Sequence, residues 1–472
     1  MTSVPPEPQD RTNPVPDLLT RDALDLSRMI AARELSAVDL MRATLARIDT
    51  VNGAVNAVVC LRDREALMGD ARLADAMAPQ GWLHGIPVAV KDLVAVRGVR
   101  STWGSPLLAG NVPAVDDGLA RRLRAAGAII IGKTNVPAFG LGSHSTNPIF
   151  GVTRTPYDLS RTAGGSSGGA GAALAARMLS VADGSDMMGS LRNPAAWNNV
   201  YGFRPTAGLV PGEARDSVFQ TRLATHGPMA RSVADMEALL TTLTDGAYRG
   251  GAKPKPAPRI AWLGDWGGAW PMEPGLLALC DAAARQMEGL GWQVDAIAPP
   301  FPAAALWDSW TTLRSFAVML DLGGHWRDPA TRDLLNPQAV WEVTQGMALT
   351  GDQVQLAAAL RLDWLACLDD VFTRYDAVMM PATQCWPFPA EWNWPHEIAG
   401  LPMDTYHRWM ECVIPASLAG APALALPAGF NADGLPGGVQ LMGPRGGDAA
   451  LLALGRVWHD AISWPQVRPP SL

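Results

Sequence analysis

The sequence predicts an α/β layered fold with a largely buried sheet, and two observations support this class. From about residue 84, apolar strands alternate with a helix: we expect a strand over Ile86–Val90, a helix over Gly118–Ala126 and a strand over Ala128–Ile131. This alternation is typical of a sheet whose faces are covered by helices. The chain has 472 residues, 48% of them apolar and 18% charged, so it can bury a sizeable core.

The other elements follow in chain order. Residues 1–18 are polar and rich in proline, and we expect a disordered tail there. Ser36 opens a sequence that resembles a capping box, so a helix should begin at this serine. The C-terminal part predicts a strand over Ala423–Leu426, another over Val439–Met442, and an amphipathic helix from Asp448.

Charge, cysteine and histidine usage exclude several classes of partner. The net charge of −7 argues against nucleic acid, which is bound by basic surfaces. Five scattered cysteines and seven histidines without ligand spacing suggest reduced thiols, no metal and no cofactor. The N-terminus lacks the pattern of a signal peptide, and prolines interrupt the longest apolar stretch, Val413–Phe430. We therefore expect a cytoplasmic protein without a membrane partner.

One segment matches a phosphate-binding pattern by letter. Residues Gly127–Thr134 satisfy GxxxxGK[ST], which would suggest nucleotide binding. A phosphate cradle needs a flexible loop of small residues, whereas an alanine and three isoleucines fill this one. We interpret the segment as a buried strand that ends at the Gly-Lys-Thr.

Two glycine- and serine-rich segments are candidates for chemistry. The segment Arg161–Gly171 is either a flexible linker or a catalytic loop, and the strong helix expected over Ala172–Met178 favours the loop. The segment Asp183–Pro194 contains a serine that is either an ordinary turn residue or a nucleophile. No histidine lies between His144 and His226, so a base for this serine would have to be another residue, most simply a lysine.

Three blocks, in this order, resemble the amidase signature family. They are Ile-Pro-Val-Ala-Val-Lys91-Asp, Gly-Gly-Ser166-Ser-Gly-Gly and Gly-Ser-Asp-Met-Met-Gly-Ser190-Leu-Arg. The resemblance implies one large α/β/α domain around a mixed, twisted sheet over residues 19–472, with a catalytic core at about 80–235. It also implies hydrolysis through a Ser–cis-Ser–Lys triad, with Ser190 as nucleophile, Ser166 as relay and Lys91 as base. The supporting residues of this site would be Gly165, Ser167, Asp186 and Arg192.

The triad sets a requirement on Lys91 and on the loop before Ser190. Lys91 can accept a proton only when neutral, so burial must lower its pKa from about 10.4 to about 7–8. We expect Asp186 and Arg192 to pair and hold the loop; the alternative is two solvated charges. The expected oxyanion donors are the backbone amides of Met187, Met188, Gly189 and Ser190.

Two positions depart from the family pattern. Met188 stands where the family usually has the first of two glycines, so the change touches the loop expected to form the oxyanion hole. Ala138 stands where the family has a glutamate in Asn-x-x-Glu-Phe. Neither change removes one of the three catalytic groups.

The substrate is less constrained than the chemistry. Most of the 18 tryptophans follow residue 250, and a tryptophan-rich region at about 255–410 would favour apolar or aromatic substrates unless these side chains serve only packing. The signature resembles the branch of broad-specificity amidases, nylon-oligomer cyclic-amide hydrolases and urethanases. We expect a monomer or homodimer that hydrolyses amides, carbamates or esters. The alternatives are the glutaminase (A-type) subunit of a tRNA-dependent amidotransferase and a non-catalytic binding module.

Overall fold

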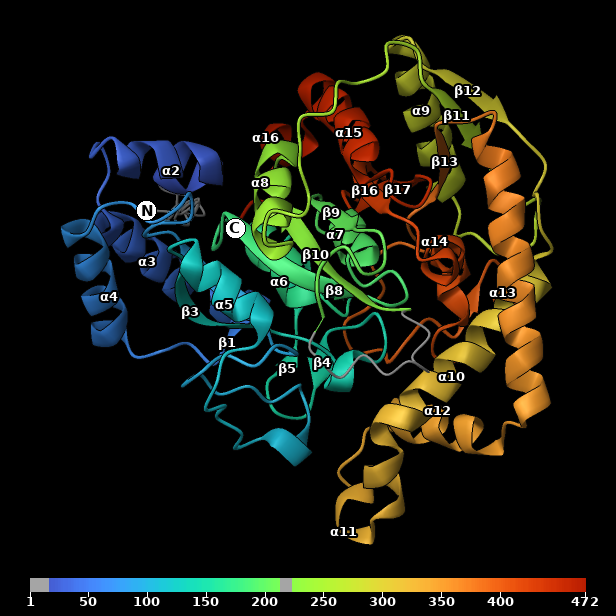
Figure 1. Ribbon diagram of the computed structural model, residues 1–472, viewed down its shortest axis with the longest axis horizontal. Coiled ribbons are helices and arrows are strands. Elements are labelled where there is room, and N and C mark those ends of the chain that lie inside the picture. Colours follow the sequence, from blue (N-terminus) through green and yellow to red (C-terminus); the bar gives the residue numbers. More distant parts are fainter. Residues whose placement is uncertain (1–16, 213–222) are drawn as a thin grey trace, which may run out of the picture.

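The structure is a computed structural model that describes residues 17–212 and 223–472 (Figure 1). The disordered tail expected over residues 1–18 falls outside the described residues up to position 16, whereas residues 17 and 18 belong to helix α1 (Asp17–Thr20). Among the described residues, no helix is long and apolar enough to cross a membrane.

The N-terminal helices pack beside a small sheet that ends at Lys91. Ser36 caps α3 as expected, because its Oγ accepts a hydrogen bond from the amide of Asp39 at 2.9 Å. The small sheet has the order β1-β3-β2, with β2 and β3 parallel. These elements are α2 (Ala23–Ala31), α3 (Ala37–Val55), β1 (Val58–Val59), α4 (Arg64–Ala76), β2 (Pro87–Lys91), α5 (Gly118–Ala125) and β3 (Ile129–Thr134).

The second sheet has eight strands in the order β12-β11-β13-β17-β16-β9-β10-β8. Strand β11 runs parallel to β12 and β13, and the other pairs are antiparallel, so the sheet is mixed, as expected. The strands are β8 (Val181–Asp186), β9 (Tyr201–Arg204), β10 (Thr225–Ala230), β11 (Arg259–Trp262), β12 (Gln293–Ala296), β13 (Ala377–Pro381), β16 (Ala423–Phe430) and β17 (Pro436–Met442).

Alternating side chains of the central strands define two helical layers. On β16, Leu424 and Leu426 face the core shared with α8 (Val233–Leu243), α9 (Leu276–Gly289) and α15 (Asp448–Ile462). Ala423 faces the opposite core. That core includes residues of α7 (Arg192–Trp197), α10 (Ala303–Arg327), α13 (Gly351–Phe372) and α14 (Ile414–Ala419). The chain is therefore one α/β/α layered domain, as the sequence predicted.

The tryptophan-rich region forms much of the second layer. In Figure 1, α10, α12 and α13 stand side by side at the right-hand and lower edge of the molecule. Trp266 stacks on Trp270, and Trp364 contacts Trp266 edge-on, so these side chains fill the core. The remaining elements are β4 (Thr146–Asn147), β5 (Gly151–Val152), β6 (Arg154–Thr155), β7 (Asp158–Thr162), α6 (Gly168–Ala175), α11 (Pro329–Arg332), α12 (Pro337–Ala348), β14 (Glu397–Ile398), β15 (Leu401–Pro402), α16 (Trp464–Val467) and the 3-10 helices η1 (Pro106–Leu108), η2 (Ala138–Gly140) and η3 (Arg408–Val413).

Several expected boundaries differ from the observed ones, and two of these differences bear on function. Strand β3 continues through the Gly-Lys-Thr to Thr134, and Lys133 is fully buried with its Nζ donating to the carbonyl of Val94. The segment is thus a strand and not a phosphate-binding loop, for the reason that its isoleucines suggested. Helix α6 begins at Gly168 instead of Ala172, because the glycines themselves form its first turn against neighbouring backbone.

Candidate active site

Lys91 is the last residue of β2, and its side chain is fully buried. Its Nζ lies 2.9 Å from Ser166 Oγ, 2.8 Å from Ser167 Oγ and 2.9 Å from Ser185 Oγ. The carbonyl oxygen of Ser185 is also within 3.2 Å of Nζ. A strand end therefore places one amine among three hydroxyl groups.

Ser166 lies in the turn between β7 and α6, and the peptide bond that precedes it, from Gly165, is cis. Its hydroxyl is almost completely buried beside Lys91. The amide of Ser167 donates to the carbonyl of Ser190 at 3.2 Å. This hydrogen bond connects the turn that holds Ser166 to the loop that holds Ser190.

Ser190 lies between β8 and α7, directly after Gly189. Gly189 has a φ of +77°, and a Cβ there would lie 2.8 Å from Oδ1 of Asn193, so only glycine fits. Met188 is not among the residues of positive φ, and its side chain is buried in the core beside α10. The departure from a double glycine is therefore accommodated at the first position, while the second position requires glycine.

The expected oxyanion hole needs one correction. The amide of Gly189 donates to Oδ1 of Asp186 at 2.9 Å, so this N–H is engaged by a carboxylate. Within the described part of the chain, the amides of Met187, Met188 and Ser190 make no comparable hydrogen bond. Three of the four expected donors thus remain.

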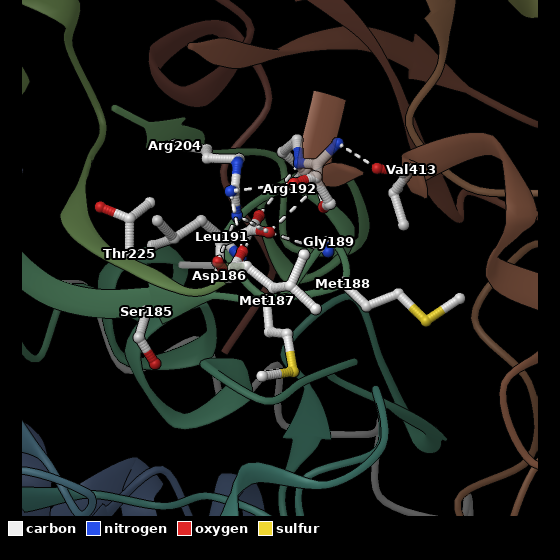
Figure 2. Close-up of polar contacts among 12 residues, drawn as sticks. Ser185, Asp186, Met187, Met188, Gly189, Leu191, Arg192, Arg204, Thr225 and Val413 are labelled. Atoms are coloured by element: carbon white, nitrogen blue, oxygen red, sulfur yellow. Dashed lines mark hydrogen bonds and ion pairs between the residues drawn. The ribbon is translucent and has the colours of Figure 1, made fainter. Parts of the chain in front are cut away.

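Asp186 is the centre of a buried charge cluster beneath the loop. Arg192 contacts both of its carboxylate oxygens at 3.0 Å, and Arg204 contacts one of them at 3.2 Å. Figure 2 shows both arginine side chains directed at this carboxylate. Burial alone would raise the pKa of Asp186, but the charge and hydrogen bonds of Arg192 outweigh it and hold the pKa below its ordinary range. The expected Asp186–Arg192 pair is present, and neither side chain is exposed to solvent.

The electrostatics of the site favour a neutral lysine. Burial lowers the pKa of Lys91 to about 7, although the carboxylates of Asp183 and Asp186 act in the opposite direction. Burial also lowers the pKa of His144 to about 4, and its two ring nitrogens already contact Thr162 and Ala390. Near pH 7 a proton can therefore be exchanged by Lys91, in the range that the sequence argument required.

Sequence reasoning missed two residues of β8 that face Lys91. Besides the hydroxyl of Ser185, Oδ1 of Asp183 accepts a hydrogen bond from the backbone amide of Lys91 at 3.0 Å. The other oxygen of Asp183 has no hydrogen-bond partner among the described residues, and burial raises the pKa of this carboxyl to about 6. The signal was available, since residues two apart on a strand share a face.

The second departure, Ala138, lies in a short turn whose other end reaches the site. Ala138 begins the short helix η2, which ends at Gly140. A Cβ on Gly140 would lie 3.5 Å from Ser166 Oγ and 2.7 Å from a methyl group of Leu93. This turn therefore lies beside the hydroxyl of Ser166, and a side chain at position 140 would clash with Leu93.

Comparisons with known proteins agree with this geometry. A family model described as Amidase matches residues 39–452. The chain is 32% identical to an acylamidase of Rhodococcus erythropolis, over 95% of this chain and 96% of that protein. It is also 32% identical to the A-type subunit of the glutamyl-tRNA(Gln) amidotransferase of Salinispora arenicola, over 97% of this chain and 100% of that protein.

Among solved structures, a bacterial aryl acylamidase of the amidase signature family is similar, with a TM-score of 0.85 and 26% sequence identity, over 95% of this chain and 99% of that chain. The family model, the full-length relatives and the shared fold lead to one assignment. The chain belongs to the amidase signature family and is a hydrolase of carbon–nitrogen bonds in amides.

Proposed function

We propose that this hydrolase cleaves aryl and alkyl amides, with carbamates and esters as further substrates, through an acyl-enzyme on Ser190. The observation that carries the proposal is the position of Lys91, whose buried Nζ lies 2.9 Å from Ser166 Oγ. A lysine with a pKa of about 7 is substantially neutral at physiological pH and can act as a base.

In the acylation step, Ser190 Oγ attacks the carbonyl carbon of the substrate and forms a carbon–oxygen bond. The proton of Ser190 passes to Ser166 Oγ, whose own proton passes to the lone pair of Lys91. As the tetrahedral intermediate collapses, the proton returns through Ser166 to the leaving nitrogen, and the carbon–nitrogen bond breaks. Water then attacks the ester by the same proton path and releases a carboxylic acid.

The negative charge on the carbonyl oxygen needs donors in the loop before Ser190. We assign this role to the amides of Met187, Met188 and Ser190, because the amide of Gly189 is engaged by Asp186. The loss of one such donor typically lowers the rate by about 10²–10³-fold. For a carbamate, the same attack followed by hydrolysis would give an alcohol, carbon dioxide and an amine as the final products.

The preference for aromatic or apolar substrates rests on two supports. Met187, which is partly exposed, adds an apolar side chain to the loop before Ser190. The similar structure is that of an aryl acylamidase. Trp266, Trp310 and Trp364 are all buried in the core and give no support to this preference.

A hydrolysis panel tests the proposal. Wild type and Ser190→Ala are compared on an aryl amide, an aryl carbamate, an aryl ester and glutamine. We expect turnover of the aryl amide by wild type and none by Ser190→Ala with unchanged circular dichroism. Undiminished hydrolysis by Ser190→Ala would overturn the nucleophile assignment.

The panel also distinguishes this proposal from a second candidate function, the glutaminase subunit of an amidotransferase. The 32% identity to such a subunit suggests that candidate. If the chain works as the glutaminase of such a complex, glutamine should be the best substrate and partner proteins should co-purify with it. We expect glutamine to be a poor substrate and the isolated chain to be active.

A further inference from the structure

Helix α10 presents two hydrogen-bond donors to the loop that precedes Ser190. The indole Nε1 of Trp310 donates to Sδ of Met188 at 3.2 Å, and a guanidinium nitrogen of Arg314 donates to Sδ of Met187 at 3.0 Å. The two donors are four residues apart on α10, so they share one face of the helix. The two acceptors are consecutive residues of the loop.

Arg314 is held in place by groups outside this loop. Its Nε donates to Glu342 at 2.6 Å, and its third nitrogen donates to the hydroxyl of Tyr406 at 2.8 Å. Ser315 binds the other oxygen of Glu342 at 2.6 Å. Burial would raise the pKa of Glu342, but the charge of Arg314 keeps it below the ordinary value, so the pair is ionised. Arg314 is therefore a fixed donor.

Trp310 is fixed by packing instead of charge. It is fully buried in the core that also contains Trp364 and Met188. A thioether is a weak acceptor, and two buried N–H donors that end on thioethers would otherwise be unsatisfied. The contacts are consequently costly to rearrange, and they restrict where Met187 and Met188 can lie.

The loop is thus held from two directions. Asp186 binds the amides of Gly189 and Leu191 at 2.9 and 3.1 Å. Figure 2 shows the Met187 and Met188 side chains extending away from this carboxylate cluster. The backbone amides of the two methionines lie between these two anchors. An oxyanion donor is effective only within a narrow distance, about 2.7–3.1 Å from the developing charge.

We propose that Trp310 and Arg314 are positioning residues of the oxyanion hole, which act through the sulfur atoms of Met188 and Met187. The proposal rests on the function proposed above, in which the amides of these methionines stabilise the oxyanion. It explains how a loop without the first glycine of the family pattern keeps its donors in place.

Two of the three test variants replace the sulfur acceptors of Met187 and Met188 with little change in packing. Met187→Leu and Met188→Leu keep nearly the same volume but cannot accept a hydrogen bond. Trp310→Phe removes the donor to Met188. The matched controls are Met380→Leu, a fully buried methionine of β13 in the same core, and Trp364→Phe, whose indole donates to the carbonyl of Pro415 at 3.0 Å.

The readouts are kcat and KM on an aryl anilide and the inhibition constant of an aryl boronic acid, which forms a tetrahedral adduct with a serine. We expect Met187→Leu, Met188→Leu and Trp310→Phe each to lower kcat about 5- to 10-fold and to weaken boronate inhibition in parallel. KM should change less than about twofold. Met188→Leu combined with Trp310→Phe should lose no more than either change alone, because both remove one contact.

Two outcomes overturn the inference. One is a wild-type kcat and boronate affinity in both methionine variants, and the other is an equal loss in Met380→Leu and Trp364→Phe, which would indicate a general packing effect. If Trp310→Phe loses its folded circular dichroism, Met188→Leu decides the matter, because it leaves Trp310 in place. Ser190→Ala run in parallel separates the two claims, since activity in that variant overturns the proposed function itself.

Discussion

The loop from Asp186 to Arg192 is held on one side by charge and on the other by helix α10. On the first side, Asp186 is bound by Arg192 and Arg204, and no part of the ion pair is exposed. On the second side, the donors come from residues 122 and 127 positions away along the chain and end on sulfur.

The two sides differ in what they tolerate. A buried ion pair that loses one partner leaves an uncompensated charge, whereas a buried thioether that loses its donor leaves an apolar group. Damage to the charged side should therefore reduce stability most, whereas damage to the α10 side should cost less stability and act mainly on rate. The predictions below separate these two effects, from the largest to the smallest.

The largest effect is expected from loss of the proposed base, Lys91, because no contact on either side of the loop can take over its role. Lys91→Met should lower kcat at least about 10⁴-fold, as loss of a triad member does in other serine hydrolases. Denaturant unfolding should show that the variant is folded. A kcat within tenfold of wild type would exclude Lys91 as the base.

The charged side is tested by Arg192→Lys. Arg192 makes five buried hydrogen bonds, to Asp186, Val413, Gln440 and Ser417, and a lysine can donate only three. Lysine keeps the positive charge but leaves buried acceptors without a donor, so we expect the free energy of unfolding to fall by about 2–4 kcal/mol, measured by denaturant titration. The control is Arg154→Lys, in a half-exposed ion pair with Glu391, which should change it by at most about 1 kcal/mol. Equal, small effects in both variants would contradict the account.

The smallest effect is a shift in pH dependence. Because the rate requires neutral Lys91, kcat/KM of wild type should rise with pH through about 7. The charge of Asp183 raises the pKa of Lys91, so Asp183→Asn should lower that pKa further and move the rise to lower pH, by up to about one pH unit. A pH–rate series on both enzymes checks the direction, and a rise displaced to higher pH would contradict it.

The sequence predicted the charged side of the loop and the residues that meet at the candidate site, because these residues occur in short blocks with fixed spacing. Lys91, Ser166 and Asp186 all lie in such blocks, and the need for a neutral lysine followed from the absence of a nearby histidine. The layered fold was also predictable, since strands such as β2 and β16 are continuous apolar runs.

The α10 side could not be predicted. Nothing in the local sequence of Met188 indicates Trp310, since the contact depends on how α10 crosses the second layer. The engagement of the Gly189 amide by Asp186 was missed for a similar reason, because it depends on the loop backbone and not on residue type. Asp183 and Ser185 were detectable by strand alternation and were overlooked beside the stronger motif.

The most direct measurement of the central claim is covalent labelling of the nucleophile. Intact-protein mass spectrometry after treatment with an aryl fluorophosphonate should show one adduct on wild type, mapped to Ser190 by peptide analysis. Ser190→Ala should show none, and Lys91→Met should be labelled far more slowly because its serine is not activated. An unlabelled wild type that still hydrolyses the aryl amide, or a Ser190→Ala variant that is labelled at the wild-type rate, would contradict the account.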